Sequence, residues 1–502
     1  MPERVPNPER GGFADWWHSL PFSGGAMVIL LLAIVSMIVV AARPSGHKGE
    51  VELWTSARQH YYMYQPVVDK WNQSAPLSRD QISMTLLSQP ALEQRMLSGF
   101  LSGTPTAELL EVERRIAARA FAGPLSSVGF VDLTDRLKAE GLLEKLNGPS
   151  FSPWSSRGRI FGIPHDVHPV MLGYRADIIE AAGVDMSKVR TWTDLFVALA
   201  PLMGPVDPDG EPKRGILNFW PTHVDLIEVL LLQAGGAYFD DSGKCTVDSP
   251  VNRRVIASLA AWCSGEPFPK GSRIAGDAQD FTAAGNNRKI NGDVLCYLMP
   301  DWMCGIYRHE MPQLDGKMKL MPLPAWSADG ADGLSTRRTS VYGGTMLGIS
   351  RTAVKSPEDF ERFWDMAKKL YLSDELAETL WKEGEIIAPN KAMWSNPMFD
   401  KPDAFFGGQA KGRMYIDLAG DVPRRSSSPF FGIAQARVQD ALFAVRDAAR
   451  KMKNPTPDDL MPETAKQMAI AQEAVERVLK RNRFLSEGAG GAAAGGSGGG
   501  AQ

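Results

Sequence analysis

Two histidines and an aspartate stand close together about one third of the way along the chain. His165, Asp166 and His168 lie between Pro164 and Pro169 in the segment IPHDVHP. Imidazole and carboxylate groups in this spacing can ligate a metal ion, and they can also form a hydrogen-bonding rim of a binding cleft. Because no third distant ligand is evident in the sequence, we predict a hydrogen-bonding rim with no metal ion and no other cofactor.

The residues around this trio predict a crossing between two bodies of the protein. A short apolar run, Ile160 to Ile163, precedes the trio, and a second apolar run ends at Tyr174. The two flanking prolines lack a backbone donor and fix φ, so the segment cannot continue as a regular central strand. We therefore expect the imidazole and carboxylate groups to lie where the two bodies meet.

No motif in the chain argues for catalysis. The sequence contains no Walker loop and no HExxH motif, and GxGxxG is absent from any strand–helix junction. The carboxylate pair of a glycoside hydrolase is recognised by its spatial separation, which a sequence does not reveal. The net charge of −3 gives no case for a nucleic-acid partner. The sequence favours a binding protein, with a glycan-active hydrolase as the weaker alternative.

The amino-terminal segment is apolar enough to suggest a membrane anchor. Residues 22–42 carry no charge, and about 20 helical residues cross the roughly 30 Å hydrocarbon layer. We predict a cytoplasmic leader over 1–21, a transmembrane signal anchor over 22–42 and a linker over 43–50. A cleaved signal peptide is the alternative, with Val40 and Ala42 before the cut. The Gly/Ala-rich tail, 487–502, is expected to be disordered.

The four cysteines fall within a single region of the chain. None has CxxC spacing, which argues against zinc binding or thioredoxin-like chemistry through Cys245, Cys263, Cys296 and Cys304. In an exported chain they permit one or two disulfides, and buried free thiols are the alternative. The sequence does not choose between these possibilities. The segment Lys289 to Met299, which contains Cys296, is predicted to form a strand.

A series of weak motifs follows the trio in order. A Gly-x-Pro crossing, an apolar run ending in Tyr, an Ala-Gly-x-Asp turn and a Thr-Trp-x-Asp helix start occur in GIPHDVHPVMLGYRADIIEAAGVDMSKVRTWTDL, residues 162–195. The series resembles the extracellular solute-binding proteins of sugar ABC transporters, family 1, which are similar to maltose-binding protein. The resemblance extends over about 51–486. It implies an α/β, two-lobed periplasmic-binding-protein-like (class II) fold with three interlobe crossings, preceded here by one N-terminal transmembrane helix.

The resemblance also divides the chain into two lobes. Lobe 1 is expected over 51–165 plus 346–388, and lobe 2 over 169–340 plus 393–486. A protein of this family clamps a mono- or oligosaccharide between its lobes and then docks on the permease subunits of an importer. This implies a single-pass protein of the cell membrane whose binding domain lies on the extracytoplasmic side. A ligand-sensing domain that reports to a signalling partner is the alternative.

Aromatic and polar side chains at loop and helix ends are the predicted ligand contacts, because aromatic rings cover the apolar faces of a sugar. Family position places Trp302, beside Asp301, against a sugar ring, with core packing as the alternative. Phe431 and Gln435 lie one helical turn apart and therefore on one face. For Trp220, packing within a lobe is the alternative. The remaining predicted ligand-binding residues are Thr55, Ser56, Arg58, His165, Asp166, His168, Tyr342, Gly343 and Gly344.

Family position suggests that His168 faces the cleft, while His165 is offset from that face. An unperturbed histidine gains its charge near pH ~6.5. We therefore expect the contribution of His168 to ligand affinity to change between about pH 5.5 and 7.5.

Overall fold

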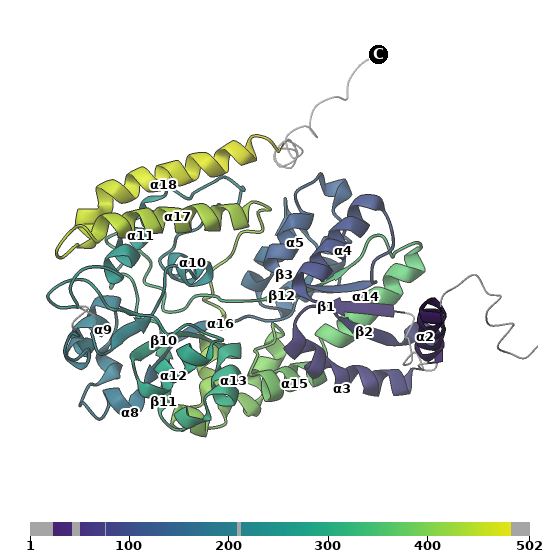
Figure 1. The fold of residues 1–502 in the computed structure, drawn as a ribbon, viewed down its shortest axis with the longest axis horizontal. Helices are drawn as coiled ribbons and strands as arrows, with labels where there is room; N and C mark the ends of the chain where they lie inside the picture. The colour runs from purple at the N-terminus through teal and green to yellow at the C-terminus, as the bar shows by residue number, and fades with distance from the viewer. Residues whose placement is uncertain (1–23, 43–50, 76, 208–211, 483–502) are drawn as a thin grey trace, which may run out of the picture. The chain divides into compact units, whose positions relative to one another are not determined.

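The first of two main β-sheets has five strands in the order β2-β1-β3-β12-β6 (Figure 1). Parallel pairing joins β1 (Val51–Thr55) to β2 (Ile82–Leu86) and to β3 (Leu109–Glu113). Antiparallel pairing adds β12 (Thr345–Ile349) beside β3, and then β6 (Ile163–Pro164). Every residue of β12 is buried, as expected for a central strand covered on both faces.

Helices cover this first sheet. The helix α3 packs against β1 and β2, α5 packs against β3, and α14 packs against β12. The start of α14 is fixed locally by a capping box, in which Ser356 and Asp359 each bond the other's backbone N–H. The helices of this part are α3 (Arg58–Ser74), α4 (Gln89–Ser102), α5 (Arg114–Ala120), α6 (Thr134–Ala139), α7 (Leu142–Lys145), α14 (Pro357–Tyr371) and α15 (Asp374–Gly384). A two-stranded ribbon, β4 (Ser155–Ser156) with β5 (Arg159–Ile160), follows them.

The second sheet also has five strands, in the order β11-β7-β10-β8-β9. Its centre is antiparallel, because β7 (Val170–Arg175) pairs in that sense with β10 (Val294–Pro300) and with β11 (Met318–Pro322). The two remaining strands, β8 (Gly215–Asn218) and β9 (Ala275–Gly276), extend it in parallel. Its associated helices are α8 (Ala176–Ile179), α9 (Trp192–Leu199), α10 (Val224–Gln233), α11 (Pro250–Trp262), α12 (Ala283–Asn291), α13 (Asp301–Glu310) and α16 (Lys411–Ala419).

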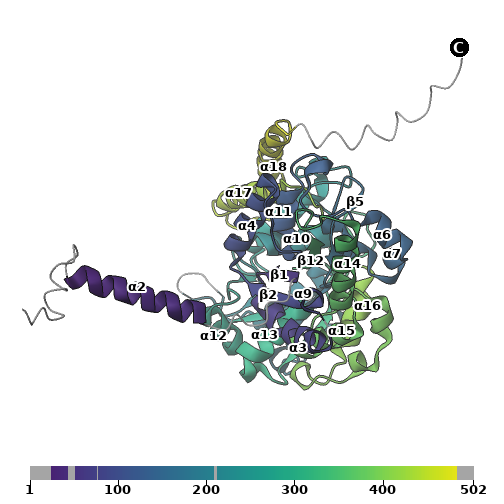
Figure 2. The same cartoon turned by 90° about the vertical axis from the view of Figure 1, so that its right-hand side faces the viewer.

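The last two helices form a layer over this second part. The helices α17 (Phe431–Ala449) and α18 (Pro457–Leu479) lie side by side in both views and pack against α11 (Figures 1 and 2). One face of α18 is apolar and buried, including Met468 and Val475. The other face is exposed to solvent, as in an amphipathic surface helix.

The chain passes between the two sheets three times. It leaves β6 for β7 through the histidine-containing segment, and it returns from β11 to β12 through 323–344. It crosses again between α15 and α16, since α15 packs on α3 while α16 packs on β11. The α/β architecture with two lobes is therefore as predicted. The boundaries of the lobes stay a prediction.

The computed structural model describes residues 24–42, 51–75, 77–207 and 212–482, which fall into two compact units, Met1–Lys48 and Gly49–Gln502. The predicted leader (1–21), linker (43–50) and tail (487–502) lie outside the described residues. In the first unit, α2 spans Gly24–Ala42, within the predicted anchor. Among the described residues, no helix combines the length and apolarity needed to cross a membrane.

The strand predicted over 289–299 is wrong at its amino-terminal end. Helix α12 begins after Thr282, whose side chain accepts a hydrogen bond from the Gly285 N–H, and it continues to Asn291. Gly292 ends the helix with a φ of +77°, a conformation that favours glycine. The buried strand β10 begins only after this turn, at Val294.

The four cysteines are free thiols, and three of them are buried. Burial raises the pKa of Cys263 to about 12, and it raises the pKa of Cys296 and of Cys304 even further. A thiol reacts through its thiolate, so all of these groups should be inert in the folded protein. Of the two possibilities left open by the sequence, the structure therefore has free thiols.

This arrangement predicts the outcome of a thiol titration. A disulfide-exchange reagent added without reductant should label almost no cysteine in the native protein. After unfolding in guanidinium it should label all four cysteines. Labelling of two or fewer cysteines in the unfolded, unreduced protein would reveal a disulfide and contradict the structure.

Candidate functional site

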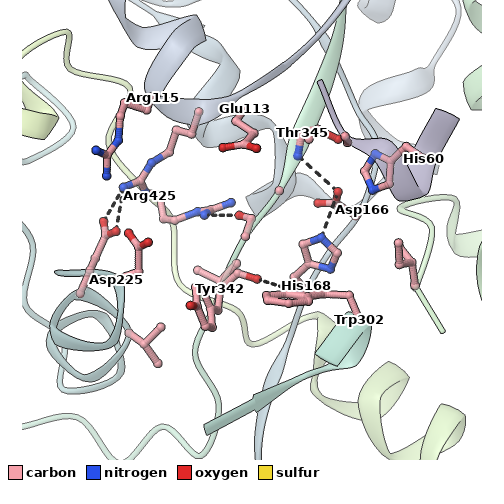
Figure 3. A pocket seen from close by; sticks show the side chains of 18 of the residues that line it. His60, Glu113, Arg115, Asp166, His168, Asp225, Trp302, Tyr342, Thr345 and Arg425 are labelled. Atoms are coloured by element: carbon pink, nitrogen blue, oxygen red, sulfur yellow. Dashed lines mark hydrogen bonds and ion pairs between the residues drawn. The ribbon is translucent and has the colours of Figure 1, made fainter. Parts of the chain in front are cut away.

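A pocket of about 330 Å³ lies where the passages between the two sheets meet (Figure 3). The carboxyl ends of β1 and β3 open into it, and so do the amino-terminal turns of α3 and α5 that follow these strands. Ligands bind at this edge of open α/β sheets. Its lining residues are Ala57, Gln59, His60, Glu113, Arg114, Arg115, Asp166, His168, Asp225, Glu228, Val229, Trp302, Val341, Tyr342, Gly343, Gly344, Thr345, Ile386, Arg425 and Phe431.

A buried imidazole held between two carboxylates forms one wall of the pocket. His168 Nδ1 donates to Asp301 Oδ1 at 2.7 Å, and His168 Nε2 donates to Asp166 Oδ2 at 3.1 Å. All three side chains are at most 5% exposed. With both ring nitrogens donating, the ring carries a positive charge. Asp301 begins α13, so this triad joins the first crossing to the second lobe.

The charges of the triad change its titration. Burial alone would lower the pKa of His168, but Asp166 and Asp301 raise it to about 10. Burial likewise tends to raise the pKa of Asp166, but His168 and His165 hold it well below its usual range. His168 is therefore charged throughout the physiological range. The expected change in its charge between about pH 5.5 and 7.5 is wrong, because the neighbouring carboxylates stabilise the imidazolium.

The same triad also contacts the other two crossings. Asp166 Oδ2 accepts from the Thr345 N–H at 3.3 Å, and Asp301 Oδ2 accepts from the Ile387 N–H at 2.8 Å. Two backbone bonds add to this, from Tyr342 N–H to the His168 carbonyl at 3.3 Å and from Val167 N–H to the Ile387 carbonyl at 3.1 Å. Three chain segments far apart in the sequence are thus fixed against one another.

Two glycines let the second crossing approach the pocket closely. Gly343 and Gly344 have φ values of +96° and +114°, which side chains rarely adopt. A Cβ at Gly343 would lie 3.0 Å from Trp302 Nε1, and a Cβ at Gly344 would lie 2.9 Å from Arg425 Nη2. The backbone can therefore reach Trp302 and Arg425 only where it carries no side chain.

Trp302 supplies the main aromatic surface of the pocket. Its indole N–H donates to the Tyr342 carbonyl at 2.9 Å, which fixes the plane of the ring. The Tyr342 ring lies edge-on at 5.4 Å, and the His168 ring at 6.4 Å. Figure 3 shows the indole below the imidazole, beside the pocket. Phe281, which is 57% exposed, stacks nearly parallel to it at 6.4 Å.

The opposite wall is charged, and its groups connect the two lobes. Arg114, at the start of α5, donates to both carboxylate oxygens of Glu228 on α10 at 2.7 and 2.8 Å. The same guanidinium lies 3.6 Å over the Phe431 ring. Arg115 donates to the Gln435 side-chain oxygen at 3.1 Å, and Gln435 in turn donates to Asp225 at 3.1 Å. Positive and negative groups are therefore largely paired with each other.

Arg425 closes the pocket near the second crossing. It donates to the Gly343 carbonyl at 2.5 Å and is held by its backbone to the Ser152 hydroxyl at 2.9 Å. Burial and the nearby Arg114 lower its pKa to about 10, which still leaves it charged at neutral pH. A guanidinium in this position offers donors to a ligand in the pocket.

Seven of the predicted ligand-binding residues line the pocket. They come from the first two passages, from α13 and from the start of α17, and they are Asp166, His168, Trp302, Tyr342, Gly343, Gly344 and Phe431. Their convergence supports the prediction that the trio and the aromatics belong to one site. Which of them contact a ligand stays a prediction.

The other seven predicted residues lie outside the lining. Thr55, Asp301 and Gln435 are buried and bond other protein groups, while His165 lies behind Asp166. Trp220 is 6% exposed and belongs to the apolar core, which was its alternative. Ser56 and Arg58 flank lining residues without lining the pocket themselves.

Sequence reasoning missed most of the charged lining. The lining residues that were not predicted, charged and uncharged together, are Ala57, Gln59, His60, Glu113, Arg114, Arg115, Asp225, Glu228, Val229, Val341, Thr345, Ile386 and Arg425. The sequence did hold a signal for Glu113, Arg114 and Arg115 in EVERR, residues 111–115. A run of charged residues at the end of a buried strand marks the carboxyl edge of a sheet, where ligands bind. No local signal pointed to Arg425, because it lies in the loop between α16 and α17 and reaches the pocket only through the tertiary fold.

A two-lobed α/β body with a ligand-sized pocket where the chain passes between its sheets fits a protein that binds a small solute. The chain belongs to the family of bacterial extracellular solute-binding proteins, whose family model matches residues 62–371. The resemblance inferred from residues 162–195 is thus confirmed.

The relatives agree with this assignment. An arabinooligosaccharide-binding protein of Halalkalibacterium halodurans is 26% identical over 446 residues, covering 86% of this chain and 91% of that protein. An arabinooligosaccharide-binding protein of Bacillus subtilis is 24% identical over 361 residues, covering 71% and 77%. The ABC-transporter-associated binding protein of B. animalis subsp. lactis, solved with β-1,6-galactobiose, matches at a TM-score of 0.60 and 16% identity, covering 87% and 99%. The structural match shows a common fold.

The triad predicts how stability depends on pH. His168→Asn should lower the free energy of unfolding at neutral pH by about 3–5 kcal/mol, because it leaves two buried carboxylates without their cation. Asparagine tolerates the φ of +54° at this position, so backbone strain should not contribute. Since folding raises the pKa of His168 to about 10, the advantage of wild type should be full below about pH 6.5 and disappear as the pH rises through 10.

Urea unfolding of both proteins at several pH values from about 6 to 10 measures this difference. The exposed His309 provides the control, and His309→Asn should leave the pH profile unchanged. A stability difference between wild type and His168→Asn that stays constant across the range would show that the triad is not charged as described.

Proposed function

We propose that the protein captures a carbohydrate, a mono- or oligosaccharide, on the extracytoplasmic side for an ABC importer. The observation that carries the proposal is the fixed indole of Trp302 beside a dense set of hydrogen-bonding groups. A sugar presents C–H faces to an aromatic ring and hydroxyls to polar side chains, so it needs this combination. The related proteins that are named for arabinooligosaccharide binding support the same class of ligand.

The electrostatics of the pocket favour a neutral, polyhydroxylated ligand. Arg114 is paired with Glu228, and His168 is compensated by two aspartates. A charged ligand would have to break such pairs, at a cost of several kcal/mol when they are buried. A hydroxyl group can both donate and accept, so it can add to these groups without separating them.

Capture would act through closure of the two lobes. Lining residues come from both lobes and from the crossings between them, so a bound ligand contacts both at once. Such a ligand shifts the equilibrium toward the closed form by its difference in affinity for the two forms. Periplasmic binding proteins are a known case of hinge closure around a ligand. The closed form would then dock on the permease subunits.

A thermal-shift screen of the purified protein against a carbohydrate library, followed by titration calorimetry of each hit, tests the proposal. A saccharide that raises the melting temperature and binds with a stoichiometry of one supports it. A protein that responds to no saccharide but binds a different class of solute in the same pocket would overturn the assignment to carbohydrates and keep the solute-binding role.

The role of Trp302 can be measured once a ligand is identified. Trp302→Ala should weaken ligand binding at least tenfold, about 1.4 kcal/mol, because the ligand loses its aromatic platform. Trp394→Ala is the matched control, since Trp394 also donates its indole N–H to a backbone carbonyl at 2.9 Å but does not line the pocket. Unchanged affinity in a folded Trp302→Ala protein would make Trp302 a packing residue only.

Retention of the protein at the membrane is a separate proposal that rests on the sequence. The uncharged run 22–42 leads us to expect that the mature protein keeps these residues and stays with membranes after high-salt washing. Membrane fractionation and amino-terminal sequencing provide the measurement. A mature protein that begins near Arg43 and is found in the soluble fraction would favour a cleaved signal peptide.

A further inference from the structure

Behind the pocket wall, three side chains with metal-binding atoms converge. One ring nitrogen from His60, one from His165 and one carboxylate oxygen from Glu111 all lie within 4.8 Å of one another. They come from α3, the first crossing and β3. Glu111 and His165 are 1% and 2% exposed, and His60 is 9% exposed and also lines the pocket.

His165 has one nitrogen committed and one without a partner. Its Nδ1 bonds Asp166 Oδ2 at 2.9 Å. Its Nε2 is buried and, among the residues that the structure describes, has no hydrogen-bond partner. A carboxylate on one nitrogen is the arrangement that orients a histidine whose other nitrogen ligates a metal. An unpaired buried acceptor is costly, so a ligand at Nε2 would remove a penalty.

Glu111 is oriented by four neighbours. Its Oε1 accepts from the Thr55 hydroxyl at 2.6 Å and lies 3.1 Å from His60 Nδ1. Its Oε2 accepts from the hydroxyls of Tyr64 and Tyr371. Ligating carboxylates are held by donors in this manner. The 3.1 Å separation of Oε1 and Nδ1 also matches the distance between two atoms that bind one ion through bonds of about 2.0–2.2 Å.

We propose that His60, Glu111 and His165 bind a divalent transition-metal ion of the zinc type. Two imidazoles and one carboxylate form a donor set that suits zinc, with a fourth position left for water. Calcium and magnesium prefer oxygen ligands, so they fit this set less well. Binding must draw the most distant pair of ligand atoms closer by up to about 1.4 Å, because two bonds of about 2.1 Å at a tetrahedral angle span about 3.4 Å.

The proposed metal site lies beside the carbohydrate pocket and shares His60 with its lining, but the proposal does not depend on carbohydrate binding. The proposal departs from the sequence-based prediction that the chain binds no metal. The sequence did not reveal this site, because Glu111 and His60 are far from His165 along the chain. The competing account is a hydrogen-bonded cluster in which His60 simply donates to Glu111. That account leaves Nε2 of His165 without a role, and an experiment can separate the two.

Zinc binding by the untagged, chelator-treated full-length protein tests the proposal. Competition with a chromophoric zinc chelator should show one tight site in wild type, and zinc should raise the melting temperature. His60→Ala and His165→Ala should each weaken zinc binding at least about tenfold, the smallest loss usual even for residues that merely support metal ligands. The matched control is His309→Ala, which removes an exposed histidine outside the cluster and should bind zinc like wild type.

Cobalt(II) gives a second readout that involves no mutation. The bound ion should show the visible bands of a site with nitrogen and oxygen ligands, without the charge-transfer band of a cobalt–thiolate bond, since the buried cysteines lie elsewhere. If His165→Ala does not fold, the more exposed His60→Ala and the cobalt spectrum decide the matter. Absence of a tight site in wild type, or unchanged binding in His60→Ala, would overturn the proposal.

Discussion

The buried contact between His168 and its two aspartates fixes the three chain passages against one another between the two sheets. Three passages of the chain must meet between two sheets, where few backbone groups can pair in regular ladders. Asp166 and Asp301 satisfy the imidazolium with one oxygen each, and the N–H groups of Thr345 and Ile387 bond the same carboxylates. Every passage is therefore tied to one buried ionic centre, and removing His168 would leave its two carboxylates buried without their cation.

The pocket is built around this centre. The triad forms one wall, and the bond from the Trp302 indole to the Tyr342 carbonyl places the aromatic surface next to it. On the other wall, the ion pair of Arg114 and Glu228 joins the start of α5, which follows β3 of the first sheet, to α10 of the second lobe. The pocket is consequently rich in donors and acceptors although most of its charges are already paired, which suits a ligand that bonds through hydroxyl groups.

The sequence predicted the parts of this arrangement that are local. The prolines around His165 and His168 exposed the first crossing, and the position of Trp302 after a strand placed it at the site. The charged wall was missed, because Arg114 and Glu228 meet only through the tertiary fold. Gln435 was predicted as a ligand contact, but it is used within the protein to hold Arg115. Periodicity reveals which face of an element is apolar, but not which distant side chain completes a polar pair.

The threefold passage between the sheets also affects how the protein is made. The first sheet needs β12, which ends at Ile349, and the second lobe acquires its covering layer only with α18, near the end of the chain. Neither half can close its core while the ribosome is still producing the first three hundred residues, and contacts between such distant segments form slowly. A nascent chain of this design therefore stays open until late, and no single cut or truncation yields either lobe as a separate folded piece.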